Sequence, residues 1–363
     1  MLDGWKEIII ENPAFYLGWG GLLIGIVFGY IVYRTNFCTM GSISDINAFG
    51  DWRRFRSWLM AGAVAMLGVA WLERAGIADM SLAMYTGPNL IWGSNIVGGL
   101  VFGIGMVLGG GCVSKNLVRT GGGDLRALLV LIVIGITAFM TIGGLFGPMR
   151  VAIFTPLGTN LSDFGIPDQR LGTILAAITG MSPDMAGLVA LVVVAGGIII
   201  WSLMDRGFRT SPSHMIAGIG IGLCVVAGWL LTGLAFDEFA DNPTLISLTF
   251  ARPTGDSLDY LMRFTAFSGA SFGVATVGGT ILGAFLGAIS QRKFALASFN
   301  GTADTVRNLI GAVLMGFGGV LALGCTVGQG LTGWSTLALG SGLTLASIVI
   351  GGFLGMKLME RLA

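Results

Sequence analysis

Three cysteines occupy short polar segments that interrupt long apolar runs. The segments read NFCTMGS (36–42), GGCVSKN (110–116) and LGCTVGQG (323–330). A neutral thiol is a weak hydrogen-bond donor and a polarizable, mostly apolar group. A cluster of thiols therefore suits a large, soft anion that carries sulfur or selenium better than a hard, hydrated ion such as phosphate. We predict a substrate pathway lined by Cys38, Cys112 and Cys325.

The residues beside these cysteines also suit an anion. The simplest structure for such a segment is a helix that stops near the middle of a membrane and a half-helix that begins after the break. Free N–H groups at a helix start carry a partial positive charge and bind anions. A fourth stretch, ALASFNG (295–301), is predicted to break in the same way. Supporting substrate contacts are predicted from Thr39, Gly111, Ser114, Lys115, Asn116, Gly324, Thr326 and Gln329.

Thiols also serve metal binding and catalysis. Cysteine ligates Cu(I) and Zn²⁺, but the sequence has no Cys-x-x-Cys pair and only one histidine. We therefore expect no metal site and no cofactor. A membrane sulfurtransferase that forms a persulfide on Cys112 or Cys325 is an alternative. It needs an ionised thiol, and no general base accompanies Lys115, so we expect no catalytic residues and no enzymatic activity.

The composition is that of an integral membrane protein. Hydrophobic residues make up 54% of the 363 positions and charged residues only 11%, against roughly 25% charge in soluble domains. A membrane-spanning helix needs about 20 mostly apolar residues, and helices satisfy their own backbone groups in lipid. We predict an all-α membrane protein with about nine transmembrane helices at 15–33, 57–74, 91–109, 126–147, 185–204, 214–234, 266–289, 308–323 and 336–356.

The distribution of basic residues predicts the orientation. With the N-terminus outside, the inner loops and tail hold 14 of the 20 Lys and Arg residues, because 6 fall outside (20 − 6 = 14). Positively charged residues favour the cytoplasmic side. The N-terminus is therefore expected outside and the C-terminus in the cytoplasm.

The chain contains an internal repeat. Residues 95–112 align without a gap with residues 308–325, at an offset of 213 (308 − 95 = 213), so that Cys112 coincides with Cys325. Residues 25–45 also resemble residues 283–304, where Ala297 stands opposite Cys38. Inverted repeats are typical of transporters whose sites lie near the bilayer midplane. We predict one membrane domain, 1–363, with repeat halves at about 14–147 and 264–357 around a less similar middle at about 150–263.

Three stretches resemble the signature segments of the YeeE/YedE family of sulfur-compound transporters. They are RTNFCTMGSISD, VFGIGMVLGGGCVSKNLVRTGGG and VLMGFGGVLALGCTVGQGLTG, in the same order as in the family. The resemblance implies an hourglass-shaped protein with nine spanning helices and short central ones, in the bacterial inner membrane. It implies uptake of thiosulfate, with Cys38, Cys112 and Cys325 passing the anion along by S–H···S contacts. It also implies a cytoplasmic TusA-like sulfur carrier, of the YeeD type, as a partner.

The segment after the middle cysteine departs from the family pattern. Family members often have a small residue followed by Thr-Gly, whereas this chain has Val113-Ser114-Lys115-Asn116. A lysine so near the path strengthens anion binding and slows release. A selenium compound or another sulfur oxyanion therefore remains an alternative substrate, and a passive pore remains an alternative mechanism. Nothing in the charge pattern indicates nucleic-acid binding.

Overall fold

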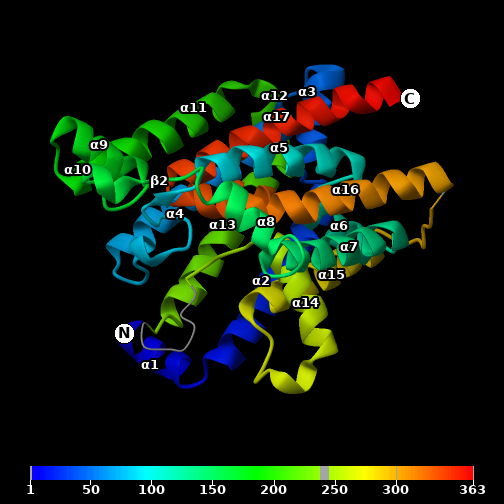
Figure 1. The fold of residues 1–363 in the computed structure, drawn as a ribbon, viewed down its shortest axis with the longest axis horizontal. Helices are drawn as coiled ribbons and strands as arrows, with labels where there is room; N and C mark the ends of the chain where they lie inside the picture. Colours follow the sequence, from blue (N-terminus) through cyan, green and yellow to red (C-terminus); the bar gives the residue numbers. More distant parts are fainter. Residues whose placement is uncertain (1, 238–244, 300, 363) are drawn as a thin grey trace.

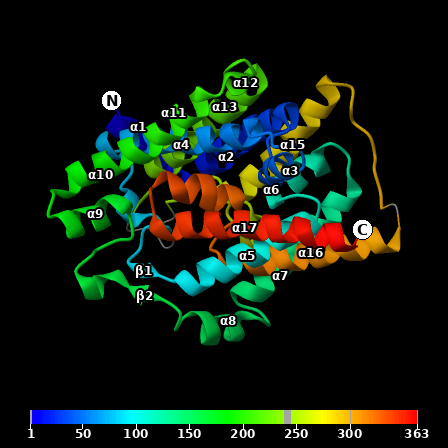
Figure 2. The ribbon, with the colours of Figure 1, turned by 90° about the horizontal axis from the view of Figure 1, so that it is seen from above.

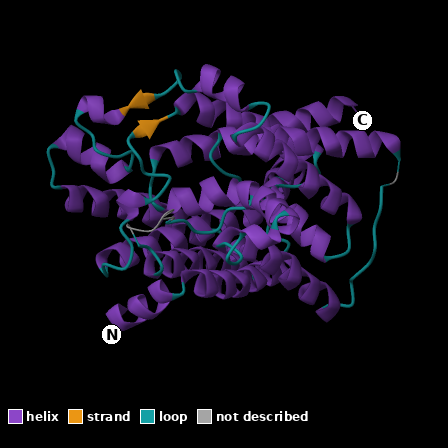
Figure 3. Ribbon diagram, turned by 60° about the horizontal axis from the view of Figure 1, so that its bottom comes forward, coloured by secondary structure: helices purple, strands orange, loops and turns teal. Residues whose placement is uncertain are grey.

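The computed structural model describes residues 2–237, 245–299 and 301–362. Most of this part of the chain is helical, as Figure 3 shows. Two short strands, β1 (Asn89–Leu90) and β2 (Thr159–Asn160), pair antiparallel, with Asn89 opposite Asn160. The predicted all-α membrane class is confirmed.

The first half of the chain forms eight helices and one short 3₁₀ segment. Proline at the first turn begins α2, where its missing N–H costs nothing. The elements are α1 (Leu2–Glu11), α2 (Pro13–Thr35), α3 (Thr39–Phe49), α4 (Arg53–Arg74), η1 (Met80–Leu82), α5 (Trp92–Leu108), α6 (Val113–Gly121), α7 (Leu125–Ile142) and α8 (Gly147–Phe154).

The remainder is equally helical and includes two short π-helical turns, η3 and η5. Its elements are η2 (Leu161–Phe164), α9 (Leu171–Thr179), α10 (Pro183–Leu191), η3 (Val192–Gly196), α11 (Gly197–Met204), α12 (Arg206–Arg209), α13 (Pro212–Leu234), α14 (Ala251–Met262), η4 (Phe264–Ala266), α15 (Phe272–Ser290), α16 (Thr302–Leu321), η5 (Gly328–Gly333) and α17 (Leu339–Leu362).

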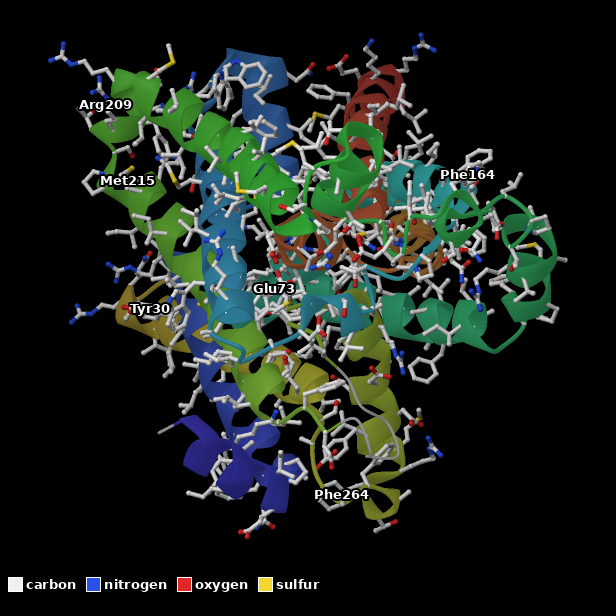
Figure 4. The ribbon with its side chains drawn as sticks, turned by 90° about the vertical axis from the view of Figure 1, so that its left-hand side faces the viewer. Tyr30, Glu73, Phe164, Arg209, Met215 and Phe264 are labelled. Atoms are coloured by element: carbon white, nitrogen blue, oxygen red, sulfur yellow. The ribbon has the colours of Figure 1, made fainter. Side chains whose placement is uncertain are left out.

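Within the described residues, eight segments are long and apolar enough to cross a membrane. They are Pro13–Phe49, Arg53–Arg74, Trp92–Gly121, Leu125–Ile142, Pro183–Met204, Pro212–Leu234, Phe272–Ser290 and Leu339–Arg361. Eight of the nine predicted spans correspond to these segments, and the remaining one, 308–323, lies in α16. Large apolar side chains are exposed on the outside, for example Phe164 and Phe264, which project from separate parts of the surface in Figure 4. The chain is a multi-pass membrane protein.

Glycines let the long helices pack closely, as their spacing predicts. A Cβ placed on Gly25 would lie 2.6 Å from the Thr276 carbonyl oxygen of α15. One on Gly99 would lie 2.7 Å from the Ser347 Cβ of α17. The small-residue stripes thus fix α2 against α15 and α5 against α17.

Helices α5 and α16, which carry the aligned repeat sequences, cross antiparallel. Gly98 packs on Gly318, and Gly105 packs on Gly311. With the offset of 213 (308 − 95 = 213), Gly98 corresponds to Gly311 and Gly105 to Gly318. Replacing each glycine by its repeat counterpart therefore turns one contact into the other. In Figure 1, α17, α5, α16 and α7 lie side by side in that order.

The prediction for the fourth break, 295–301, is wrong. The described residues between Ser290 and Thr302 form no helix, and the chain runs as a loop along the edge of the molecule (Figure 2). Arg292, with a φ of 55°, ends the turn after α15, and Ala297 pairs with Asp124 in an isolated bridge. Charged residues directly after the helix keep this segment at the surface. Among the described residues of the four predicted segments, those after the three cysteines form a short helical segment, whereas this loop leads into the long helix α16.

Candidate functional site

The first break in a transmembrane helix lies between α5 and α6. Helix α5 stops at Leu108, and Gly110 and Gly111 follow with φ values of 69° and 148°. A Cβ on Gly110 would approach Arg119 Nη1 at 2.8 Å, and one on Gly111 would approach Lys115 Cγ at 3.0 Å. Glycine is therefore required by both backbone conformation and space. The break ends at Cys112, which is the N-cap of α6.

The other two breaks lead to cysteines in the same local setting. Cys38 is the N-cap of α3, after Asn36 has ended α2 with a left-handed φ of 54°. Cys325 follows α16 and precedes η5. Leu323, between α16 and Cys325, also has a left-handed φ, of 57°. The part of the prediction in which one helix stops before each cysteine and a short helical segment begins after it is confirmed by these positions.

Each cysteine sulfur faces the backbone N–H of the residue three positions later. Gly41 donates to Cys38 Sγ at 3.4 Å, and Gly328 donates to Cys325 Sγ at 3.4 Å. The Lys115 N–H faces the Cys112 thiol in the corresponding way. Sulfur is a weak acceptor, so these N–H groups are held only loosely and are available to a stronger acceptor.

The three thiols gather at one place inside the protein. Each of these cysteines is at most 6% exposed. Cys38 and Cys112 face each other at interaction distance, and Cys112 and Cys325 are near enough to interact electrostatically. The fourth cysteine, Cys224, lies buried within α13 as a packing residue.

The predicted neighbours of Cys112 divide into two groups. Ser114 Oγ lies 3.2 Å from Cys112 Sγ, and the buried Thr326 hydroxyl faces the same thiol. Thr326 Oγ1 has no hydrogen-bond partner among the described residues. Asn116, in contrast, donates to the Gly111 carbonyl at 2.9 Å and so holds the break itself. Ser114 and Thr326 therefore face the Cys112 thiol, whereas Asn116 does not.

The remaining predicted residues support the breaks from outside the thiol cluster. Thr39 is the buried first residue of α3. Gly324 packs against the Gln329 side chain, whose Nε2 donates to the Ala322 carbonyl at 2.6 Å. Lys115 is half-buried and its ammonium donates to Asn36 Oδ1. Lys115 thus joins two of the breaks and adds positive potential near Cys38.

Sequence reasoning missed a buried, non-helical stretch, residues 245–250, that packs against the Cys325 break. The Leu248 carbonyl accepts a hydrogen bond from Thr332 Oγ1 at 2.6 Å, and the Phe250 N–H faces the Cys325 sulfur. This stretch lies in the less similar middle of the chain, at about 150–263. Its uncharged, apolar run after an acidic loop is the only local sign of burial.

The chain matches known proteins over most of its length. The family model described as sulphur transport matches residues 34–354. A thiosulfate transporter, TsuA, of Spirochaeta thermophila is 28% identical over 338 residues, covering 92% of this chain and 96% of that protein. TsuA of Escherichia coli is 26% identical over 355 residues, covering 91% of both chains. A probable transporter, YedE, of Salmonella typhimurium is 29% identical over 105 residues, or 29% of this chain and 24% of its own.

The family match spans all three cysteine breaks and both aligned repeat sequences. With its several apolar helices, this multi-pass membrane protein belongs to the sulphur-transport family.

Proposed function

We propose that the protein takes up thiosulfate, or a closely related sulfur anion, along a path lined by Cys38, Cys112 and Cys325. The observation that carries the proposal is the convergence of three buried thiols, each at the start of a helical turn. Two relatives that cover nine-tenths of the chain are named thiosulfate transporters. The terminal sulfur of thiosulfate is large and polarizable, and its oxygens accept hydrogen bonds.

The arrangement suits both ends of such an anion. Polarizable thiols contact the terminal sulfur, and loosely held N–H groups and the free Thr326 hydroxyl bind the oxygens. Such groups replace part of the water that the ion loses on entering the protein. The thiols stay neutral and pass the anion from Cys325 through Cys112 to Cys38 by S–H···S contacts.

The proposal includes the setting in the cell. We place the protein in the bacterial inner membrane, with the N-terminus outside and the C-terminus in the cytoplasm. This orientation is supported by 14 inner basic residues among 20 (20 − 6 = 14) and the positive-inside rule. A TusA-like carrier of the YeeD type receives the sulfur in the cytoplasm. A reporter that is active only in the periplasm is fused to the C-terminus and is expected to be inactive. Activity of this fusion would contradict the orientation.

Uptake by cells tests the function. The chain is expressed in a bacterial host that lacks other thiosulfate importers, with thiosulfate as the sole sulfur source. Growth and saturable accumulation of labelled thiosulfate are expected. An absence of both, while the protein is present in the membrane, contradicts the proposal. Competition by selenium compounds and other sulfur oxyanions ranks the alternative substrates.

A persulfide-forming enzyme is distinguished by mass spectrometry of the purified protein after turnover. Transport by reversible S–H···S contacts leaves the masses of the cysteine-containing peptides unchanged. An added sulfur atom retained on Cys112 or Cys325 identifies a sulfurtransferase instead.

A further inference from the structure

An open, mainly apolar groove of about 630 Å³ lies at the surface of the protein, where helix α5 ends. Three helices form its walls: the end of α5, with Leu108, the first turns of α16, and the end of α17, with Leu358. The α16 wall includes Val306, Arg307 and Ile310. In the described lining, Arg307 is the one charged residue, so the groove combines a long apolar surface with a cation.

The groove exists because α5 stops while its two neighbours continue. Gly311 of α16 packs on Gly109, and Gly355 of α17 packs on Val107. Beyond these contacts α16 extends nine residues (311 − 302 = 9) and α17 seven residues (362 − 355 = 7). At 1.5 Å per residue these ends project about 10–14 Å, toward the right of the view in Figure 1. The break after α5 therefore leaves a hollow between two projecting helix ends.

Cations flank the groove at the level where the predicted spans begin and end. Arg307 directly precedes the predicted span 308–323, and Lys357 directly follows the predicted span 336–356. Lys357 and Arg361 are both exposed on the last turns of α17. Both projecting walls thus carry positive charge at the boundary between the hydrocarbon core and the lipid headgroups, with apolar side chains further in.

The protein balances this positive charge only in part. Arg307 donates to Asp304 Oδ1 at 2.5 Å, and Asp304 Oδ2 lies 3.8 Å from Arg126, so one carboxylate is shared between two guanidinium groups. On α17 the neighbouring acid is Glu360, which accepts a hydrogen bond from Asn47. The Arg307 side chain is 42% exposed, and a guanidinium carries five N–H donors. Donors therefore remain for an anionic ligand.

The position of the groove indicates what occupies it. Leu108 and Ile310 fall inside the predicted spans 91–109 and 308–323, so the deep part of the groove lies in the hydrocarbon core. Lipid tails are present there, whereas a water-soluble partner is not. Basic pockets between transmembrane helices bind the headgroups of anionic lipids. A phospholipid with a negatively charged headgroup fits both the apolar walls and the cations.

We propose that this groove is a binding site for one anionic phospholipid. The phosphate lies between Arg307 on one wall and Lys357 and Arg361 on the other, because guanidinium groups bind phosphate with paired hydrogen bonds. An acyl chain packs along Leu108 and Ile310. The bound lipid holds α16 and α17 against the end of α5, next to the break that precedes Cys112. This inference goes beyond transport and does not depend on which anion is carried.

The test compares two lipids with the same acyl chains. The purified full chain in detergent is titrated with phosphatidylglycerol, which carries a net negative charge, or with phosphatidylcholine, which carries none. Native mass spectrometry counts the bound lipids. One phosphatidylglycerol is expected to bind at least about tenfold more tightly than phosphatidylcholine. Equal affinity for the two lipids overturns the inference, because it means unselective contact with lipid.

Removing the cations tests the headgroup contact. Arg307 and Lys357 are exposed, so the Arg307→Gln, Lys357→Gln double variant is expected to fold. Its affinity for phosphatidylglycerol should fall roughly tenfold or more, since each cation makes a charge-assisted contact. Its affinity for phosphatidylcholine should not change. Undiminished binding of phosphatidylglycerol overturns the inference.

The matched control removes the same charge elsewhere. Arg206 and Arg209 are exposed on α12 and do not line the groove, and the sequence places them on the same side of the membrane. Arg209 is labelled in Figure 4. Arg206→Gln with Arg209→Gln is expected to keep the affinity for phosphatidylglycerol. An equal loss in both double variants means general attraction to surface charge and overturns the site.

Filling the groove separates it from the cations around it. Ala303 is exposed and lines the groove, so Ala303→Phe occupies the place of the acyl chain and leaves every charge unchanged. We expect affinity for phosphatidylglycerol to fall roughly tenfold, because apolar contacts of the chain are lost. Unchanged affinity in this variant means that only the headgroup is bound, and overturns the groove. Uptake of thiosulfate is measured separately, so its failure leaves this comparison intact.

Discussion

The breaks after α5 and after α16 share a backbone design but differ in their surroundings. With the offset of 213 (308 − 95 = 213), Gly110 corresponds to Leu323, and both are left-handed, with φ values of 69° and 57°. Asn116 corresponds to Gln329, and each side-chain amide donates to a carbonyl of its own break, at 2.9 and 2.6 Å. The same device for ending a helix thus occurs at both places.

The break after α5 is filled by charged groups. Arg119 donates to the Gly110 carbonyl at 2.9 Å and pairs with Asp124 at 2.8 Å. Lys115 joins the same region to Asn36 at the end of α2. Asn308, near Gly110, donates to the Asp304 carbonyl at 2.7 Å.

The break after α16 is uncharged and hollow. Thr332 stands where the first break has Arg119 (119 + 213 = 332) and donates to the Leu248 carbonyl. Asn95, the counterpart of Asn308, lines a cavity of about 170 Å³ beside the Cys325 break, and its Oδ1 has no hydrogen-bond partner among the described residues. The two breaks therefore share a backbone design but differ in charge: Arg119 and Asp124 form an ion pair at the first, and Thr332 makes a neutral hydrogen bond at the second.

The largest expected effect comes from removing the thiol of one break while the other remains. Cys112 faces Cys38 and Thr326, so Cys112→Ala interrupts the path at its centre. We expect thiosulfate uptake to fall at least about tenfold, equivalent to about 1.4 kcal/mol. Labelled uptake at equal protein level measures it. The control is Cys224→Ala, which removes a thiol from α13 and keeps uptake; equal rates in both variants would argue against a thiol path.

Loss of Arg119 at the break after α5 should lower the stability of the protein more than loss of the Thr332 hydroxyl at the break after α16. Arg119→Met removes hydrogen bonds to Gly110 and Asp124 and is expected to lower stability by about 1–3 kcal/mol. Thr332→Val removes one neutral hydrogen bond and should cost about 1 kcal/mol. Thermal unfolding of the purified variants gives the order. A larger loss of stability for Thr332→Val than for Arg119→Met would contradict the described difference between the two breaks.

Lys115 tests whether the cation near Cys38 acts on the anion. Lys115→Gln keeps a hydrogen-bond donor for Asn36 but removes the charge. We expect the thiosulfate concentration for half-maximal uptake to rise about threefold, with no fall in maximal rate because release becomes easier. Lys115→Arg serves as the charge-preserving control. A lower maximal rate at unchanged half-saturation would assign Lys115 a structural role only.

The smallest effect is expected at the backbone position that the two breaks share. Leu323 adopts a left-handed φ that favours glycine, and it is 42% exposed. Leu323→Gly is expected to change stability by less than about 1 kcal/mol, since relief of strain offsets lost side-chain packing. Gly110→Leu should destabilise far more, because its Cβ would meet Arg119. Equal melting temperatures for the two variants would contradict the comparison.

Much of this arrangement is predictable from local sequence, and the reasons are physical. Long apolar runs predict the membrane helices, and Gly-Gly-Gly-Cys at 109–112 predicts a break because glycine readily adopts the positive φ values found at Gly110 and Gly111. The alignment of residues 25–45 with residues 283–304 led to the wrong prediction of a break at 295–301. The two sequences differ just before it, because Lys293 stands where the first half has Thr35 (293 − 258 = 35). A charge at that point keeps the chain at the surface.

The cavity beside the Cys325 break could not be predicted from the sequence in the same way. Tyr85, Asn95, Gln169 and Ser341 come from four parts of the chain, and each is an ordinary polar residue at a helix end or in a loop. Only the tertiary packing of α5 and α17 with the loop after α4 and the segment before α9 brings them together. Single-sequence patterns do not specify that packing. Asn95 alone carried a signal, through its alignment with Asn308.

The most direct test of the central claim is a density map of the protein with bound selenosulfate, whose selenium atom can be located by anomalous scattering. The account predicts a selenium peak in contact with the Cys112 sulfur, between Cys38 and Cys325. A fully occupied peak elsewhere, with no selenium near any of the three thiols, would contradict it.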